Sequence, residues 1–516
     1  MKKKMSFILE EKRYFGAENK WSVFFVTIVL SLILFVSGVP GCSDDAADDD
    51  VGDAHMEAGV WDGDVHDGGF VDGTVDGSGG EDPDGSVEPP SCGEIVTFES
   101  GLEPSDYIHV AEQGSDDEGD GSLDSPFATI RHATDRVEPG GAVRVHPGTY
   151  EGGVYLSGLV GGESTPIWIG GVPGEERPVI DASGNGSGIY MTEPRYVILH
   201  DLEITGATGN GVNCDDGGNY GNDEAARYVV FRNLFIHNIG SDGNQDCLKL
   251  SGLNDFYVLE SEFTVCGGGG SGSGVDCVGC HRGLIARNNM YELSGNAVQT
   301  KGGSEDIEIR WNRITNVGNR GLNMGGGTGF EYFRPPLSTS TPNFEARDIR
   351  AVANVFEGSY AAIAFAGCVD CVAANNTIIE PENWIFRILQ ETVTDGDYEF
   401  LPCSNGYIAN NLVVFRRGDI SIHLNIGPNT DAESFIFETN LWYASDDPQG
   451  GSQPNLPSTE NGGLVGEDPG FVNGYEIDST SPAAGAGTPV SSLVAGDVEG
   501  ECYQDPPSIG AYSVQD

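Results

Sequence analysis

A short alternation of apolar and polar residues recurs along much of the chain. VILHDLEI at 197–204, IEIRWNRI at 307–314 and YIANNLVV at 407–414 each place a polar pair, often ending in Asn, between apolar residues. Alternation with a period of two predicts short strands that bury one face. After the N-terminal apolar run, no stretch of useful length has the period of a helix, so the pattern predicts an all-β protein.

The spacing of these units predicts a solenoid. When the second polar residue of each unit is aligned, successive members lie 22 to 42 residues apart. The aligned residues are Asp201, Asn233, Ser261, Asn289, Asn312, Asn354, Asn376, Asn411 and Asn440. The shortest intervals match one coil of a parallel β-helix, and the longer ones leave room for loops inserted at a turn. We therefore predict a right-handed parallel β-helix of about ten or more coils, with its Asn side chains stacked on one corner.

The two flanks of this region resemble the ends of many exported β-helix proteins. SPFATI at 125–130 resembles a short capping helix of those proteins, and PGTY at 147–150 resembles the turn that closes their first coil. DPGFVN at 468–473 and IGAY at 509–512 resemble the matching exit segment. The resemblance implies the β-helix fold but no particular activity, because one fold hosts many activities.

The N-terminus predicts export. Basic residues precede an apolar run at 23–36, which has the length of a signal-peptide core and is short for a membrane span. VPGC at 39–42 resembles a bacterial lipobox, in which the cysteine, here Cys42, is lipidated and becomes the mature N-terminus. We therefore expect a lipoprotein signal peptide at 1–42 and a location in the bacterial cell envelope, at the outer membrane or cell surface. An uncleaved anchor helix is the alternative.

Composition divides the rest of the chain in two. Residues 43–90 hold thirteen Asp, three Glu and no Lys or Arg, which predicts a disordered tether with too little apolar surface to offset its ordering entropy. Residues 91–516 are then the β-helix domain, with a capping segment at about 105–150 and an exit segment at about 465–514.

The net charge of the chain limits the kinds of molecule that it can bind. The chain has 26 Lys and Arg against 80 Asp and Glu, a net charge of −54, which repels nucleic acid and anionic membrane surfaces. We expect a monomer that meets a membrane only through its lipid anchor.

The cysteine count predicts disulfides. Removing Cys42 from eleven cysteines leaves an even number, which fits disulfides in an oxidising compartment. The C-x-x-C pairs at 277–280 and 368–371 are some four coils apart, so we favour disulfides at turns over one shared zinc.

Alternation also identifies the outward face of one sheet. Apolar residues at one position of successive coils should point inward, and their neighbours should then point outward. The first outward row is Asn213, Lys249, Asp276, Gln299, Asn323 and Ala364, and the second is Asp215, Ser251, Val278, Lys301 and Gly325. A flat face with cations, carboxylates and amides fits a polysaccharide groove, in which Asn213, Gln299 and Asn323 are the candidate substrate-binding residues.

Lysine is rare in the body of the chain. Lys249 and Lys301 are the only lysines after Cys42, against eighteen arginines, and both fall on the predicted outward face. Arginine does not give up its proton in practice, whereas a lysine whose pKa is lowered can act as a base. Lys249 and Lys301 are therefore the candidate catalytic residues. Chance placement on a solvated face is the alternative.

The residues around these lysines carry a resemblance. DCLK at 246–249, GVD at 274–276 and Lys301 one coil later resemble the calcium-dependent pectate lyases of the ninth polysaccharide lyase family. The resemblance implies that Asp246 and Asp276 bind Ca²⁺ and that Lys301 abstracts the proton alpha to a uronate carboxylate. Where that family places paired aspartates, this chain has Gly272 and Ser273, and Asp242 is the candidate replacement.

A second resemblance covers the next coil. NNMYELSGNAVQTKGGS at 288–304 resembles the alginate and chondroitin lyases of the sixth family. Of the functional residues of that family, the chain retains Lys301 and Asn289. Both resemblances imply a polysaccharide partner.

Three functions remain open at this stage. The first is a lyase or C5-epimerase acting on an acidic glycan, and the second is a carbohydrate-binding or adhesive surface lipoprotein without catalysis. The third, a glycoside hydrolase, needs clustered outward carboxylates, for which the chain offers only Asp276 with Asp246 or Asp215. Residues 92–516 carry 20 basic and 61 acidic residues, so a polyanion would be repelled unless calcium bridges it, and a neutral glycan also stays open.

The lipobox generates a direct prediction. Cys42→Ala, or treatment with globomycin, should leave the precursor unprocessed and abolish labelling with a fatty-acid analogue, because the cysteine is the acceptor of the lipid. Labelling that survives the substitution would exclude the lipobox and favour the uncleaved helix.

Overall fold

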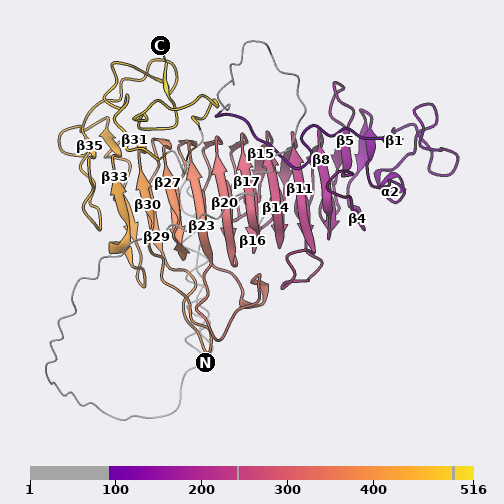
Figure 1. Ribbon diagram of the computed structural model, residues 1–516, viewed down its shortest axis with the longest axis horizontal. Coiled ribbons are helices and arrows are strands. Elements are labelled where there is room, and N and C mark those ends of the chain that lie inside the picture. Colours follow the sequence, from indigo (N-terminus) through magenta and orange to yellow (C-terminus); the bar gives the residue numbers. More distant parts are fainter. Residues whose placement is uncertain (1–91, 241–242, 491–493, 495, 516) are drawn as a thin grey trace, which may run out of the picture. The chain divides into compact units, whose positions relative to one another are not determined.

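Short strands with alternating burial form three parallel sheets in the computed structural model (Figure 1). The structure describes residues 92–240, 243–490, 494 and 496–515, which belong to one compact unit, Val87–Asp516. Cys42, Asp242, the predicted signal peptide and the predicted tether lie outside the described residues. No helix in the part of the chain that the structure describes is long and apolar enough to span a membrane.

Sheet 1 has thirteen strands in the described chain and faces the viewer in Figure 1. Its strands are β1 Asp106–Val110, β2 Gly141–Val145, β5 Ile167–Gly171, β8 Arg195–His200, β11 Ala226–Arg232, β14 Leu253–Leu259, β17 His281–Ala286, β20 Ser304–Arg310, β23 Ala346–Val352, β27 Val372–Ala374, β30 Tyr407–Ala409 and β33 Ile436–Glu438, with β26 Cys368–Val369 paired to β23.

Sheets 2 and 3 contain twelve and ten strands. Sheet 2 consists of β3 Thr149–Glu151, β6 Val179–Asp181, β9 Glu203–Thr205, β12 Phe235–Ile239, β15 Glu262–Cys266, β18 Asn289–Tyr291, β21 Arg313–Thr315, β24 Val355–Glu357, β28 Thr377–Ile379, β31 Leu412–Phe415, β34 Leu441–Ala444 and β35 Leu464–Val465. Sheet 3 consists of β4 Val154–Ser157, β7 Ile189–Thr192, β10 Val212–Asp215, β13 Leu248–Ser251, β16 Val275–Val278, β19 Val298–Lys301, β22 Arg320–Gly325, β25 Ala361–Ala366, β29 Trp384–Leu389 and β32 Leu424–Ile426. The short pair β36 Ile477–Asp478 and β37 Val514–Gln515 lies apart from them.

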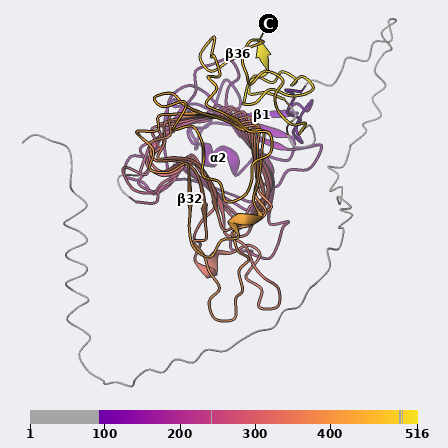
Figure 2. The same ribbon diagram turned by 90° about the vertical axis from the view of Figure 1, so that its left-hand side faces the viewer.

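Each coil visits the three sheets in turn, as β8, β9 and β10 do before β11, β12 and β13 repeat the path. Figure 2 looks along the stack, where the coils superpose around one interior. That interior is filled by buried apolar side chains, including Phe231, Phe256, Phe263 and Phe356. The ten strands of sheet 3 confirm the predicted number of coils.

Asn side chains are stacked on the corner between sheets 1 and 2. From Asn312 onward, the Oδ1 atom of each stacked Asn accepts hydrogen bonds from the backbone N–H and the side-chain amide of the Asn one coil earlier, whereas Asn288 Oδ1 accepts from the Ser261 backbone N–H. The amide of each Asn also donates to a backbone carbonyl, so these fully buried groups are satisfied. The stacked residues are Asn288, Asn312, Asn354, Asn376, Asn411 and Asn440.

Three of the aligned residues, Asp201, Asn233 and Asn289, are one position off this stack. Asn288, not Asn289, donates to Asn312, whereas Asn289 begins β18 and is exposed. Asn233 has φ 52° and lies just before the stacked position, which Leu234 occupies. The corner consists of a residue in the left-handed conformation followed by the stacked residue, and Asn suits both positions. The predictions for Asp201, Asn233 and Asn289 are therefore wrong by one residue.

A short helix closes the N-terminal end. Helix α2, Ile130–Thr134, packs against β1, β2 and β4, and it lies across the end of the stack in Figure 2. The Thr129 hydroxyl accepts a hydrogen bond from the backbone N–H of His132, which makes Thr129 the N-cap. The stretch 125–130 was expected to form the helix, but it enters the helix only at its last residue.

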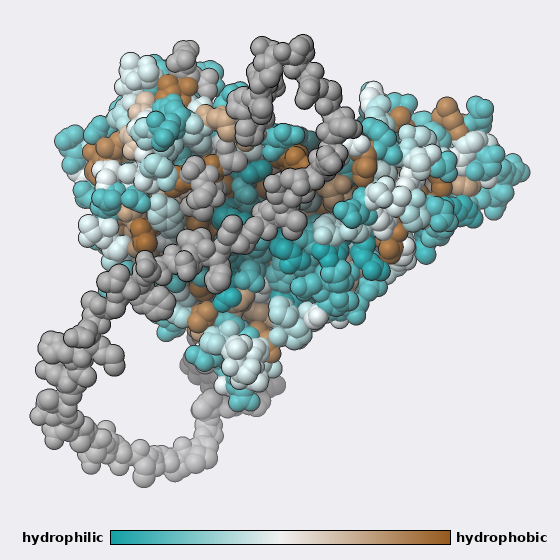
Figure 3. Space-filling model, viewed as in Figure 1, coloured by the Kyte–Doolittle hydropathy of each residue, from teal (hydrophilic) through white to brown (hydrophobic). Residues whose placement is uncertain are grey.

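Segments from both ends of the described chain cover outer faces of the coils. Phe98 and Leu102 pack on an apolar row of sheet 1 that includes Trp168 and Ile198. A C-terminal segment packs on the Trp311 region, where the Trp311 indole donates to the Gly496 carbonyl. Elsewhere the face in Figure 3 is mainly hydrophilic, with scattered hydrophobic residues.

Six of the ten described cysteines form disulfides. Disulfides join Cys92 to Cys502, Cys247 to Cys266 and Cys368 to Cys371. The other four described cysteines, Cys214, Cys277, Cys280 and Cys403, are buried thiols. The predicted disulfide at 368–371 is confirmed and the one at 277–280 is wrong; both pairs flank a residue with φ 58°, and the backbone does not explain the difference.

The Asn stack generates a stability prediction. Asn376→Ala should lower the free energy of unfolding by about 2–4 kcal/mol, because the buried N–H of Asn354 and the carbonyl of Ala351 lose their partners. Asn289→Ala is the matched control on the exposed neighbouring position and should change it by less than about 0.5 kcal/mol. Chemical unfolding monitored by circular dichroism measures both. Equal losses would mean that the stack does not stabilise the fold.

Candidate active-site cleft on sheet 3

The strand register of sheet 3 places the predicted outward rows side by side. Asn213 pairs with Lys249, Lys249 with Asp276, Asp276 with Gln299, Gln299 with Asn323, and Asn323 with Ala364. The second row is paired in the same way and consists of Asp215, Ser251, Val278 and Lys301. The row at Cys214, Leu250 and Cys277 faces the core and is buried.

Lys249 and Lys301 meet at one carboxylate. The Lys249 Nζ donates to Asp276 Oδ2 and lies 3.5 Å from Asp246 Oδ2, while the Lys301 Nζ lies 3.5 Å from the same Asp276 oxygen. The two ammonium nitrogens are therefore no farther apart than twice that distance, although their strands are separated by β16. The prediction that both lysines share one face and lie close together is confirmed.

Burial sets the electrostatics of this cluster. The Asp246 and Asp276 side chains are each 1% exposed, whereas Lys249 and Lys301 are 18% and 14% exposed. Burial raises the pKa of Asp246, the Asp276 charge adds to this, and Lys249 opposes it, which gives a pKa of about 7. Burial also acts to raise the pKa of Asp276, but Lys249 and Lys301 outweigh it and lower that pKa below its ordinary value.

The same contacts fix the charge of Lys249. Burial acts to lower its pKa, but the Asp276 and Asp246 carboxylates outweigh burial and raise it above the ordinary value for lysine. Lys249 is therefore held as an ammonium ion and is poorly suited to accept a proton. Lys301 contacts only one of the two carboxylates.

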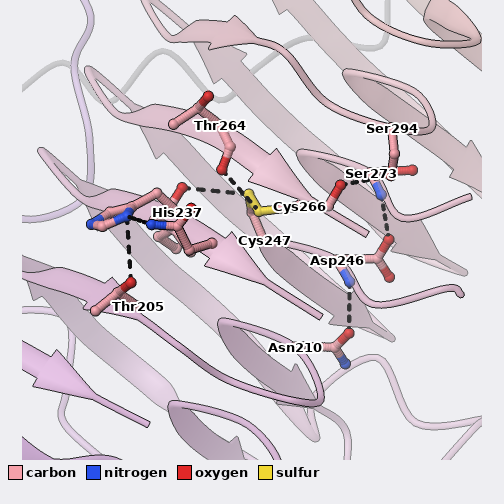
Figure 4. The surroundings of a disulfide bond; sticks show 11 residues. Thr205, Asn210, His237, Asp246, Cys247, Thr264, Cys266, Ser273 and Ser294 are labelled. Atoms are coloured by element: carbon pink, nitrogen blue, oxygen red, sulfur yellow. Dashed lines mark hydrogen bonds between the residues drawn. A yellow bond between two sulfur atoms is a disulfide. The ribbon is translucent and has the colours of Figure 1, made fainter. Parts of the chain in front are cut away.

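Neighbouring coils hold Asp246 in place (Figure 4). Its backbone N–H donates to Asn210 Oδ1 at 2.8 Å, and its Oδ1 accepts from the Ser273 backbone N–H at 2.7 Å. The next residue, Cys247, forms the disulfide with Cys266 on β15. The Asp246 carboxylate thus lies in a turn that is bonded to the coil on each side.

A cleft of about 500 Å³ lies over these strands, within the usual range for small-molecule sites. Lys249 and Lys301 contribute to its wall together with Asn213, Ser251 and Val278 from the two outward rows. Asp215 of the second outward row also lines the cleft. The rest of the lining comes from the segments between the strands, namely Asp216, Gly217, Gly218, Tyr220, Asn244, Gly327, Thr328, Gly329, Tyr332 and Arg334.

The loop between β22 and β23 supplies part of the cleft wall and contacts the turn at 215–220. Arg334 donates to both carboxylate oxygens of Asp216, at 2.8 and 3.2 Å, and its guanidinium lies 4.0 Å from the centre of the Tyr220 ring. Its backbone N–H donates to the Gly302 carbonyl. A bidentate, buried Arg–Asp pair is geometrically specific, so it fixes this loop over the sheet.

Glu345 ties the same loop to the end of β19. Its carboxylate accepts hydrogen bonds from the backbone N–H groups of Gly302 and Thr328, both at 2.8 Å, and from the Thr328 and Thr392 hydroxyls. Burial is the main cause that raises its pKa, and these hydrogen bonds oppose it. Glu345 therefore positions the turn after Lys301 relative to the cleft wall.

The predicted substrate-binding residues differ in their placement. Asn213 lines the cleft and donates to Asp215 Oδ2 at 3.0 Å. Gln299 and Asn323 lie on the predicted row but are not part of the cleft lining. The Asn323 side chain is 3% exposed because it accepts from Arg320 and donates to the Gly325 carbonyl.

The sequence did not indicate that Arg334, Tyr220 or Glu345 belongs to the site. The one available signal was the long interval between Asn312 and Asn354, which indicated an inserted loop. The interval gave no indication of which loop residues turn back over the sheet.

The described residues do not fit a calcium site. Calcium takes about six to eight oxygen ligands, most often with several carboxylates. The buried oxygens without hydrogen-bond partners on these turns and strands include Asp246 Oδ2 and Asp276 Oδ1, together with the uncharged Gln245 Oε1, Ser273 Oγ and Asn296 Oδ1. Of these five oxygens, two belong to carboxylates, and two lysines neutralise both. Within the described ranges no group of three or more His, Cys, Asp or Glu is arranged to hold a metal ion.

Comparisons with known proteins identify the fold. No protein-family model and no curated protein matches the chain. Among solved structures, the pectate lyase Pel9A is similar at 16% identity with a TM-score of 0.51, over 81% of this chain and 98% of that one. Its likeness confirms the right-handed parallel β-helix, and the predicted distant resemblance holds at the level of the fold.

Two further structures are similar at lower scores. A rhamnogalacturonan lyase is 16% identical with a TM-score of 0.44, over 68% of this chain and 89% of that one. An alginate lyase from Paenibacillus sp. str. FPU-7 is 14% identical with a TM-score of 0.41, over 63% of this chain and 99% of that one.

Substitution of Glu345 tests whether its hydrogen bonds hold the cleft loop to the end of β19. Glu345→Ala should lower the free energy of unfolding by about 3 kcal/mol, because four donors lose their buried acceptor. Glu305→Ala removes a 43% exposed carboxylate paired to Arg347 at 3.6 Å and should cost less than about 1 kcal/mol. Thermal and chemical unfolding of the two variants measure the difference. A loss at Glu345 no larger than at Glu305 would contradict its role.

Proposed function

We propose that the chain acts on an acidic polysaccharide in the sheet 3 cleft, as a lyase or a C5-epimerase. One observation carries the proposal: the two lysines of the body meet at one buried carboxylate beside the cleft. A uronate brings a carboxylate and a weakly acidic C5 proton. A fixed cation and a neighbouring amine are the groups that its deprotonation requires.

The two lysines take different roles in this proposal. Lys249 is held charged by Asp246 and Asp276, so it would receive the uronate carboxylate and stabilise the enolate that forms. Lys301 has a single ion-pair partner and would accept the C5 proton. Both lysines were catalytic candidates from the sequence, and this proposal gives each of them a separate role.

The chemistry then has two outcomes. In a lyase, the C5–H electron pair forms the C4=C5 double bond while the C4–O bond breaks and its oxygen leaves with the attached sugar. In an epimerase, the enolate is protonated again on the opposite face. Both begin with the same proton transfer to Lys301.

Charge supports an acidic substrate locally. The cleft lining contains three cations, Lys249, Lys301 and Arg334, against two carboxylates, Asp215 and Asp216, whereas residues 92–516 are strongly acidic in total. Pel9A, the pectate lyase with the same fold, agrees with this substrate class without assigning it.

Non-catalytic glycan binding is the second candidate. The observation that favours it is that both lysines already have carboxylate partners, which stabilises their charged forms. A charged lysine binds a uronate but cannot accept its proton.

We also propose that the body is displayed on the bacterial cell envelope through Cys42. The three disulfides support export to an oxidising compartment.

Lysine substitutions test the proposed reaction. Incubation of the purified protein with polygalacturonate, alginate or a glycosaminoglycan should give unsaturated products that absorb in the ultraviolet. Lys301→Ala should lower the rate by about 10²–10⁴-fold, because it removes the general base. Lys249→Ala should lower the rate by a smaller factor than Lys301→Ala. Deuterium incorporation at C5 in heavy water detects an epimerase that gives no unsaturated product.

The control is a surface cation outside the cleft. Arg347→Ala removes a partly exposed guanidinium on sheet 1 and should leave the rate unchanged. Saturable glycan association with neither unsaturated product nor deuterium exchange would favour the binding protein. Full activity of Lys301→Ala would exclude Lys301 as the base.

A further inference from the structure

Two buried carboxylates on neighbouring coils need a cation between them. Asp246 and Asp276 are each 1% exposed, and ionised carboxylates at such depth are costly unless they are paired. Asp246 lies before β13 and Asp276 lies within β16, so the fold itself brings the two charges together.

The cation between them belongs to the chain. The Lys249 Nζ contacts the Oδ2 atoms of both carboxylates, and Lys249 is on β13, directly after the turn that holds Asp246. The Lys301 ammonium adds a second positive charge at 3.5 Å from Asp276. When both carboxylates are ionised and both lysines are protonated, the cluster is neutral.

This neutrality conflicts with a divalent ion at the same place. A calcium ion beside Asp246 and Asp276 would lie close to two ammonium groups that contact the same oxygens, and like charges at such short range repel strongly in a poorly solvated site. Its remaining ligands would be the uncharged Gln245, Ser273 and Asn296 oxygens. Calcium favours carboxylates, and affinity falls as the ligand charge falls.

We propose that the Lys249 ammonium occupies the position of a divalent cation, so that this cluster is complete without calcium. The assignment concerns the cation position alone, and it holds whether or not the chain cleaves a glycan. It also gives a reason for lysine at position 249: an ammonium is a compact point charge, whereas the planar guanidinium of arginine favours side-by-side bidentate pairs.

Calcium titration of the full-length protein tests this proposal. We expect that the thermal unfolding midpoint of the wild type shifts by no more than about 1 °C with a chelator or with Ca²⁺ at about 10 mM. This Ca²⁺ concentration is above the dissociation constants of extracellular calcium modules, which are about 10⁻⁴–10⁻³ M. Lys249→Met keeps the length of the side chain and removes the charge. Its midpoint should rise by about 2 °C or more with Ca²⁺, because the freed carboxylates then bind the ion.

Lys301→Met is the matched control. It removes the other lysine but leaves the Lys249 ammonium between the carboxylates, so its midpoint should not respond to Ca²⁺. If Lys249→Met does not fold alone, recovery of folding by Ca²⁺ during refolding supports the proposal, and failure to recover contradicts it. Calcium stabilisation of the wild type that Asp276→Asn abolishes would overturn it. A folded Lys249→Met variant without a calcium response would overturn it as well.

Discussion

The hydrogen-bond register between successive strands of sheet 3 is the constraint on which the cleft depends. Lys249 on β13, Asp276 on β16 and Lys301 on β19 share one face only because each strand is paired in a single register. A shift of one residue would turn a lysine toward the apolar interior. The Asn stack on the opposite corner opposes such a shift, because it would leave several fully buried amides and backbone N–H groups without partners.

The sequence predicted those parts of the structure that repeat. The outward rows followed from alternation alone. The apolar residues of β13 and β19 point inward, and Lys249 and Lys301 lie at the alternate positions, so the two lysines point outward. The Asn corner was predicted to within one residue, because adjacent positions there both suit Asn. The cleft wall was beyond prediction: the Arg334–Asp216 pair joins residues 118 apart, and no local pattern encodes where a non-repeating loop returns.

Charge in this molecule is organised on two scales. The body as a whole is strongly acidic, and that field extends into solvent over a distance set by salt. The few cations of the cleft are held individually, Arg334 by Asp216 and Lys249 by Asp246 and Asp276. Partly buried pairs are screened little by salt, so ionic strength should act on the approach of a charged ligand more than on the arrangement that receives it.

The disulfide between Cys92 and Cys502 joins residues 410 apart and thereby links the segments that cover the outside of the coils. A solenoid is held mainly by contacts between neighbouring repeats, so its ends are the natural places for it to unravel. Here the two ends are parts of one covalent ring. The ring can close only after the last coil and the C-terminal segment have been synthesised, so this disulfide bond cannot form before nearly the whole chain has been made.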